Sequence, residues 1–161
     1  MILEWIEVSG VRNLSSARLD LAAGSNLLVG PNGSGKTSLL ESVYILSTAR
    51  SYRHGQLGPV ITRGTDSAVV RGGVGQHVIG VQRDRDGSRR IRVDGEDIKR
   101  SSDLAVLLPI LLLEPGTIEL LTGSPDLRRR FMNWGLFHVK HNFAQLWQEA
   151  TRSLKQRNRI L

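Results

Sequence analysis

The sequence predicts an α/β fold with a parallel or mixed core sheet, an antiparallel β unit at about 60–95 and helices at about 124–161. Three observations predict this class. An apolar run at 25–30 ends in glycine and leads through a glycine-rich loop into an amphipathic segment. Residues 68–94 alternate with a period of two, and the residues after 124 return to helical spacing. With 161 residues, the chain is long enough for one domain with a sizeable core.

The N-terminal elements follow from local patterns. Residues 2–9 alternate loosely as a strand with one wetter face, and residues 17–21 alternate cleanly as a second strand. The continuous apolar run "SNLLVG" at 25–30 is typical of a buried strand in an α/β sheet. Apolar side chains at helical spacing between 36 and 49 predict a helix of about three turns, which begins at the glycine-rich loop.

The antiparallel unit consists of three predicted strands at 67–74, 77–84 and 89–95. Asp86-Gly87, between the last two, is a hairpin signal. The glycines of this region could be mistaken for a second phosphate loop. We interpret them as turns and bulges, because none of them precedes a helix.

The remaining elements are mostly helical. Residues 101–109 can begin a short helix with a serine cap, and "ILLLEP" at 110–115 has the composition of a buried strand. Ser124 and Pro125 are suited to the cap and first position of a further helix. The final helix, 143–161, ends while its apolar pattern is still running, so the sequence shows no partner for that face.

Composition narrows the function classes. The net charge is +7, and 18 of the 22 basic residues are arginine, which favours bidentate contact with phosphate groups. Nucleic acid is therefore an expected partner, with a basic surface kept for solubility as the alternative. The absence of cysteine excludes a disulfide framework, and the four scattered histidines do not have metal-ligand spacing. No apolar run approaches a membrane span, so we expect a cytoplasmic protein without membrane contact.

The strongest motif is "GPNGSGKT", which matches G-x-x-x-x-G-K-[ST] and lies between an apolar run and a helix, as a phosphate-binding loop does. Its expected ATP-binding residues are Gly30, Pro31, Asn32, Gly33, Ser34, Gly35, Lys36 and Thr37, followed by Ser38. Glycines allow backbone N–H groups to surround a phosphate. Lys36 is expected at the β and γ phosphates, the Thr37 hydroxyl at Mg²⁺, and Ser38 at the α phosphate.

The loop variant and several further segments resemble the RecF family of SMC-related, ABC-type ATPases. "VRNL" is similar to its F-R-N segment, and "SVYILSTARSYR" is similar to the stretch that follows its first helix. "PGTIELLTGSPDLRRRFMN" and "LKQRN" are similar to later family segments. The resemblance covers essentially all of the chain and implies an ABC-ATPase-like head lobe.

The resemblance also implies a function. We expect an ATP- and Mg-binding protein that binds single-stranded, linear duplex or gapped DNA in replication, recombination repair and the SOS response. Recombination-mediator proteins and a second copy of the chain, engaged in an ATP-dependent homodimer, are the implied partners. The family's signature motif and Walker B strand lie beyond position 161. We therefore expect a partial head domain, 1–161, that has lost hydrolysis and whose helical segment leads towards a missing lobe.

Two positions depart from the family pattern. Gly116 stands where the family has an acid after the proline, and Asn133 stands where it has Asp. Gly116 falls in the expected Q-loop, which links nucleotide state to movement between lobes. A lost carboxylate there puts that coupling in question, and Glu114 can substitute only if the backbone shifts.

Three alternatives stay open on the residues. "ILLLEP" mimics a Walker B strand, which would make Glu114 catalytic, although no "LSGGQ"-like segment precedes it. A stand-alone P-loop phosphotransferase would need a lid and a catalytic acid, and neither is apparent. A non-catalytic interaction fragment would use the final helix to bind another lobe or subunit.

Arginines outside the loop are the remaining candidates. Arg12 lies in the turn that the resemblance places close to the nucleotide, so we expect it to contact phosphate, with a surface ion pair of a turn residue as the alternative. The expected DNA-binding residues are Arg50, Arg53, Arg89 and Arg92. Neighbouring residues of a strand face opposite sides, so not all arginines of the hairpin can touch one duplex. Aromatic residues make up 5% of the chain, which favours backbone contact over base stacking.

Overall fold

A computed structural model describes residues 2–114, 117, 119–140 and 142–160. Its strands form one six-stranded sheet in the order β2-β1-β3-β4-β5-β6, in which each neighbouring pair is antiparallel. The strands are β1 (Leu3–Val11), β2 (Leu14–Asp20), β3 (Ser67–Val74), β4 (His77–Asp84), β5 (Arg89–Val93) and β6 (Glu96–Asp97). The three strands expected between 67 and 95 therefore form, and they continue the sheet that β1 and β2 begin.

The chain divides into two compact units, Met1–Leu111 and Leu112–Leu161. The helices of the first are α1 (Lys36–Thr48), the short 3-10 helix η1 (Gly58–Val60) and α2 (Ser101–Leu107). Those of the second are α3 (Glu119–Thr122), α4 (Pro125–Val139) and α5 (Phe143–Ile160). None of the helices in the described ranges is long and apolar enough to cross a membrane. The predicted helices at 36–49, 101–109, 124 onward and 143 onward are confirmed.

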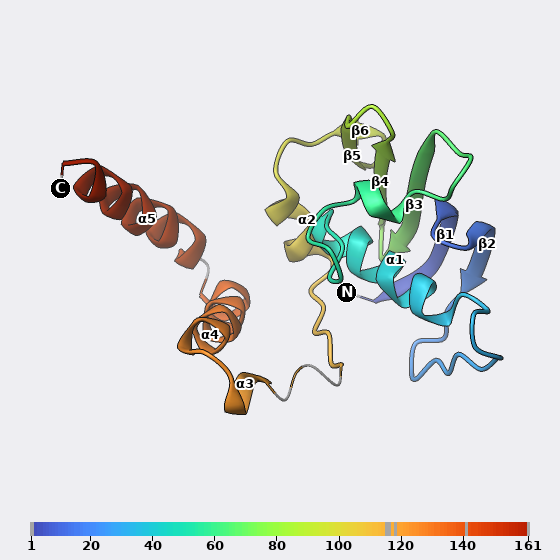
Figure 1. The fold of residues 1–161 in the computed structure, drawn as a ribbon, viewed down its shortest axis with the longest axis horizontal. Helices are drawn as coiled ribbons and strands as arrows, with labels where there is room; N and C mark the ends of the chain where they lie inside the picture. The colour runs from blue at the N-terminus through green and yellow to red at the C-terminus, as the bar shows by residue number, and fades with distance from the viewer. Residues whose placement is uncertain (1, 115–116, 118, 141, 161) are drawn as a thin grey trace. The chain divides into compact units, whose positions relative to one another are not determined.

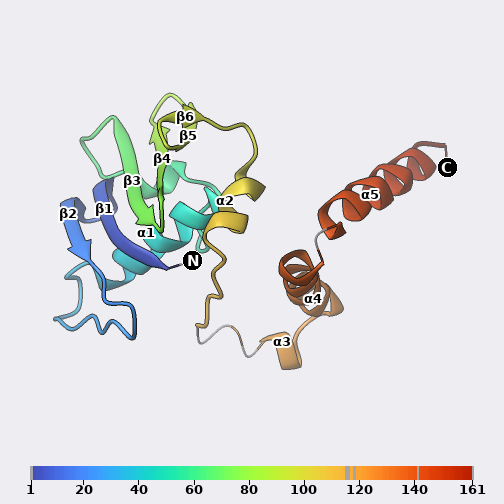
Figure 2. The same cartoon turned by 180° about the vertical axis from the view of Figure 1, so that it is seen from behind.

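One face of the sheet forms the core of the first unit. In Figure 1 α1 lies in front of this sheet, and in Figure 2 it lies behind it. Gly72 of β3 permits this close approach, because a Cβ there would lie 2.5 Å from a Leu46 methyl group. The cross-strand partners on this inner face are Val8, Val70, Val81 and Ile91 in one row and Ile6, Gly72, Ile79 and Val93 in the next.

Two expected strands are not formed. Residues 25–30 and 110–114 have no strand pairing, so the parallel or mixed part of the expected sheet has no counterpart among the described residues. Leu27 and Val29 are 87% and 83% exposed, and Leu113 is 74% exposed. An apolar run indicates a tendency to be buried, but a buried strand also needs neighbouring strands to accept its backbone hydrogen bonds. The fold class itself, an α/β head lobe, is confirmed by the comparisons reported below.

The second unit has an open, apolar surface within the described residues. Ser124 is the N-cap of α4, as expected, although its side chain makes no capping bond, and α4 buries none of its residues. Phe131 stacks on Trp134 in α4, and Phe143 stacks on Trp147 in α5. Trp147 and Leu154 of α5 remain about half exposed. Helical side chains of this kind usually pack against another element.

A buried carboxylate ties α1 to the β1–β2 turn. Glu41 is fully buried, and its two carboxylate oxygens accept hydrogen bonds from Nε and Nη2 of Arg12, each at 3.0 Å. The Ser51 hydroxyl donates a further bond to Glu41 at 2.5 Å. Burial by itself raises the pKa of Glu41. The hydrogen bonds from Arg12 and Ser51, with the charges of Arg12 and Arg53, outweigh burial and hold that pKa below its ordinary value of 4.5.

We predict that Glu41→Gln lowers the free energy of unfolding at pH 7 by about 2 kcal/mol, because it removes charge-assisted hydrogen bonds from a buried group. Since the pKa is lower in the folded state, the charged form stabilises the fold above about pH 4.5. This contribution is lost as the pH falls through the folded-state pKa. Urea unfolding of both proteins at pH 7 and pH 3 measures the difference.

Glu7→Gln is the matched control, because Glu7 pairs with Arg18 at 3.6 Å and its side chain is 41% exposed. Exposed pairs contribute about 0–1 kcal/mol. An equal loss for Glu41→Gln at both pH values would contradict a charge-based role.

Candidate functional site

The glycine-rich loop connects residue 30 to the first turn of α1. Gly33 and Gly35 have φ angles of 83° and 98°, in the left-handed region where side chains are disfavoured. Gly35 is also crowded, since a Cβ there would lie 2.5 Å from a Leu14 methyl group. Both glycines are therefore required by the backbone path, which places the loop at the start of α1.

The start of α1 is suited to an anion. Gly35 is its N-cap without a side-chain bond, and the first turn has no acidic residue. The first N–H groups of a helix have no acceptor within the helix, so this end carries partial positive charge. The Lys36 ammonium donates to the carbonyl oxygens of Gly30 and Pro31, each at 2.7 Å, and Thr37 is exposed. Backbone donors, one cation and one hydroxyl thus lie in consecutive residues.

Asn13, which was not among the expected site residues, contacts the loop at two points. Its side-chain amide donates to the Gly33 carbonyl oxygen at 2.6 Å, and its amide oxygen accepts a bond from the Ser38 hydroxyl at 2.7 Å. Ser38 itself is buried. The sequence places Asn13 in the turn between two strands and in the segment that resembles the F-R-N segment of the family, but neither observation reveals the contact.

Arg12 lies beside Asn13, but its guanidinium binds protein acceptors. Besides its two bonds to Glu41, Nη1 donates to the Pro59 carbonyl oxygen at 3.1 Å. Three of the five N–H groups of the guanidinium are therefore engaged, which leaves two. An ion pair was the alternative expected for Arg12, but its partner Glu41 is buried in α1 and does not lie at the surface.

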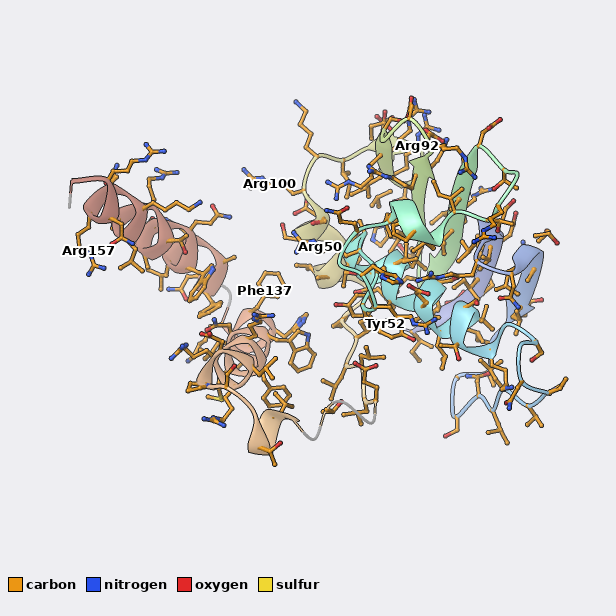
Figure 3. The ribbon with its side chains drawn as sticks, viewed as in Figure 1. Arg50, Tyr52, Arg92, Arg100, Phe137 and Arg157 are labelled. Atoms are coloured by element: carbon orange, nitrogen blue, oxygen red, sulfur yellow. The ribbon has the colours of Figure 1, made fainter. Side chains whose placement is uncertain are left out.

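The expected DNA-binding arginines lie on two faces of the sheet. Arg50 and Arg89 line a hollow of about 320 Å³ together with Arg83, whose Nε is buried without a hydrogen-bond partner. Arg92 instead lines a hollow of about 400 Å³ on the opposite face, with Arg71 and Arg90. Figure 3 shows Arg50 beside the segment that follows α1 and Arg92 at β5. Arg92 also pairs with Asp97 at 2.8 Å.

The cross-strand register explains this separation. On the outer face, Glu7, Arg71, Gly80 and Arg92 stand opposite one another on β1, β3, β4 and β5. Gly80 has no side chain, which leaves the hollow between the two arginines. Arg53 lies with neither group of hollow-lining residues and contributes to the field at Glu41. The structure therefore groups Arg50 with Arg89 and separates both from Arg92.

Three further candidates lie near or in the second unit. Glu114 is exposed, does not end a strand, and its backbone N–H donates to the Thr117 hydroxyl at 2.9 Å. Asn133 is half-buried in α4. Gly116 lies outside the described residues, so its expected role in coupling stays a prediction.

Sequence relatives agree with the motifs. A DNA replication and repair protein RecF from Stutzerimonas stutzeri (strain A1501) is 46% identical over 163 residues, which cover 98% of this chain and 44% of the relative. The RecF protein of Idiomarina loihiensis is 40% identical over 161 residues, covering 100% of this chain and 46% of the relative. The chain thus spans less than half the length of these relatives.

Solved structures agree with the fold. The structure of the recombination mediator protein RecF with ATP in the RecFOR pathway matches with a TM-score of 0.82 and 25% identity, covering 98% of this chain and 44% of that one. A structure from a study of ATP-driven dimerisation and DNA-stimulated activation of SMC ATPases matches with a TM-score of 0.68 and 18% identity, covering 83% and 99%. The RecF/RecN/SMC N-terminal domain model matches residues 2–118. The chain therefore belongs to the RecF/RecN/SMC N-terminal domain family.

Proposed function

We propose that this chain binds ATP through residues 30–38. The main support is the conformation of the loop, in which Gly33 and Gly35 have left-handed backbones and lead into the start of α1. This start has no side-chain cap, and the Lys36 ammonium lies against the loop. Backbone N–H groups of the loop would surround the β phosphate, and Lys36 would release its loop carbonyls for the β and γ phosphates. Arg12 would add a contact through its two remaining N–H groups. The RecF structure solved with ATP supports this proposal by similarity.

Mg²⁺ would be held by the Thr37 hydroxyl, phosphate oxygens and water, which is a usual coordination for this ion. Hydrolysis additionally needs a carboxylate near the metal and the attacking water. No run of four apolar residues followed by Asp occurs after the loop, and the first turn of α1 has no acid. We therefore propose that these 161 residues bind ATP without efficient turnover.

We propose further that the chain contacts DNA through backbone phosphates, as part of a cytoplasmic RecF-type protein of replication, recombination repair and the SOS response. Arg50 and Arg89 are exposed, line the same hollow and form no ion pair among the described residues, and they carry this step. Recombination-mediator proteins and an ATP-dependent homodimer are the proposed partners. The exposed apolar side chains of α4 and α5 support contact with another protein surface.

Lys36→Ala is expected to reduce Mg-ATP binding below detection in isothermal titration calorimetry, because it removes the cation from the phosphate loop. Lys99→Ala is the control, since Lys99 is exposed and lies outside the loop. Equal affinity of the Lys36→Ala variant and the unchanged chain would contradict the assignment of the loop.

For DNA, we predict that the double variant Arg50→Ala/Arg89→Ala weakens binding of a duplex of about 30 base pairs. It should also reduce the slope of log affinity against log salt by about 1–2, since each lost phosphate contact removes about 0.9 from the slope. Fluorescence anisotropy between low and moderate salt measures both quantities.

Arg92→Ala provides the comparison from the opposite face. Because Arg92 is already neutralised by Asp97, we expect a smaller change in slope. An affinity that barely depends on salt would contradict backbone contact altogether. A larger effect of Arg92→Ala than of the double variant would place the DNA on the outer face instead.

A further inference from the structure

Asn13 bridges two parts of the phosphate loop. Its amide nitrogen lies 2.6 Å from the Gly33 carbonyl oxygen, and its amide oxygen lies 2.7 Å from the Ser38 hydroxyl. A carbonyl oxygen can only accept, so the amide nitrogen must face Gly33. The amide oxygen then faces Ser38, whose hydroxyl must donate. Both ends of the amide are therefore fixed by their partners.

The residue before Asn13 is held in a strained conformation. Arg12 has a φ of 56°, which is unfavourable for a residue with a side chain. Its backbone N–H donates to the Val60 carbonyl oxygen at 2.7 Å, its carbonyl oxygen accepts from the Thr62 hydroxyl at 2.8 Å, and its side chain binds Glu41. Strain of this kind persists only where the surroundings impose it, and it often occurs at functional sites. The contacts of Arg12 therefore hold the turn, and with it the backbone of Asn13, in one position.

We propose that Asn13 is a positioning residue for phosphate binding, an inference that rests on the proposed nucleotide function. By holding the Gly33 carbonyl, it fixes the plane of the Gly33–Ser34 peptide, which sets the path of the loop at its centre. It also takes the single hydroxyl proton of Ser38. Ser38 therefore offers an α phosphate its backbone N–H, and its hydroxyl supports Asn13 instead of contacting phosphate.

The test measures Mg-ADP affinity of single and double variants by titration calorimetry. Asn13→Ala should raise the Kd about tenfold, the scale of one lost hydrogen bond to the loop. Asn13→Asp should bind more weakly still, because its carboxylate would face the Gly33 carbonyl and add negative charge beside the phosphates. Ser38→Ala in the Asn13→Ala background should cause no further loss, because both substitutions break the same bond.

Asn26→Ala is the matched control. Asn26 also bonds through both ends of its amide, to the backbone of Ala22 and Gly24, but it lies outside the phosphate loop. Its substitution should leave the Kd unchanged. Asn13 is exposed, so the urea midpoint of Asn13→Ala without nucleotide should equal that of the unchanged chain.

Three results would overturn the positioning role: an unchanged Kd for Asn13→Ala, additive losses for Asn13→Ala and Ser38→Ala, or a fall in the urea midpoint that accounts for the lost affinity. If Lys36→Ala abolishes binding while Asn13→Ala has no effect, the nucleotide proposal stands and only the role of Asn13 fails. If the unchanged chain binds no Mg-ADP or Mg-ATP, both proposals fail.

Discussion

The ion pair between Arg12 and Glu41 is the constraint on which the first unit depends. A carboxylate that is fully buried in α1 is tolerated only with charged and hydrogen-bonding partners, so Arg12 and Ser51 must both reach it. Arg12 lies in the turn after β1, and Ser51 lies just after α1 ends. One carboxylate therefore fixes the helix, the turn and the following segment relative to one another.

The phosphate loop inherits its geometry from this arrangement. Its glycines allow the left-handed backbone conformation, but glycine by itself does not favour one conformation of the loop over others. Two contacts fix the conformation of the loop: Leu14 packs against Gly35, and the Asn13 amide donates to the Gly33 carbonyl oxygen. Both contacts come from the β1–β2 turn and the residue after it, which the buried pair holds in place. The core of the sheet therefore supports the buried ion pair, and the ion pair holds the turn that positions the loop.

The sequence predicted the elements whose signals are local and missed those that depend on distant partners. Period-two alternation located β1 and β3–β5, and the loop consensus located the start of α1. The apolar runs at 25–30 and 110–115 carried no information about the strands they would pair with, so burial was expected where the structure has exposed side chains. Alternation along β5 correctly separated Arg89 from Arg90, but Arg92, which was grouped with Arg89 as a DNA-binding residue, lies with Arg90 on the opposite face. The sequence had no comparable signal for the roles of Asn13 and Ser51. Glu41 did have one, because it is a charged residue on the face of α1 that also holds the buried Ser38, Ser42 and Ile45.

The two proposed anion sites rely on different physics. Between residues 30 and 48 the only charged side chains are Lys36 and Glu41, and Glu41 is neutralised by Arg12. Attraction of a nucleotide to the loop therefore rests on the single charge of Lys36 together with N–H dipoles at short range, and these dipoles are effective only when the backbone is held in position. The arginine hollow concentrates full charges whose attraction extends over about 10 Å and is screened by salt. Rigidity matters for the first site and charge density for the second, which is consistent with the buried ion pair lying beside the loop while the exposed Arg50 and Arg89 line the hollow.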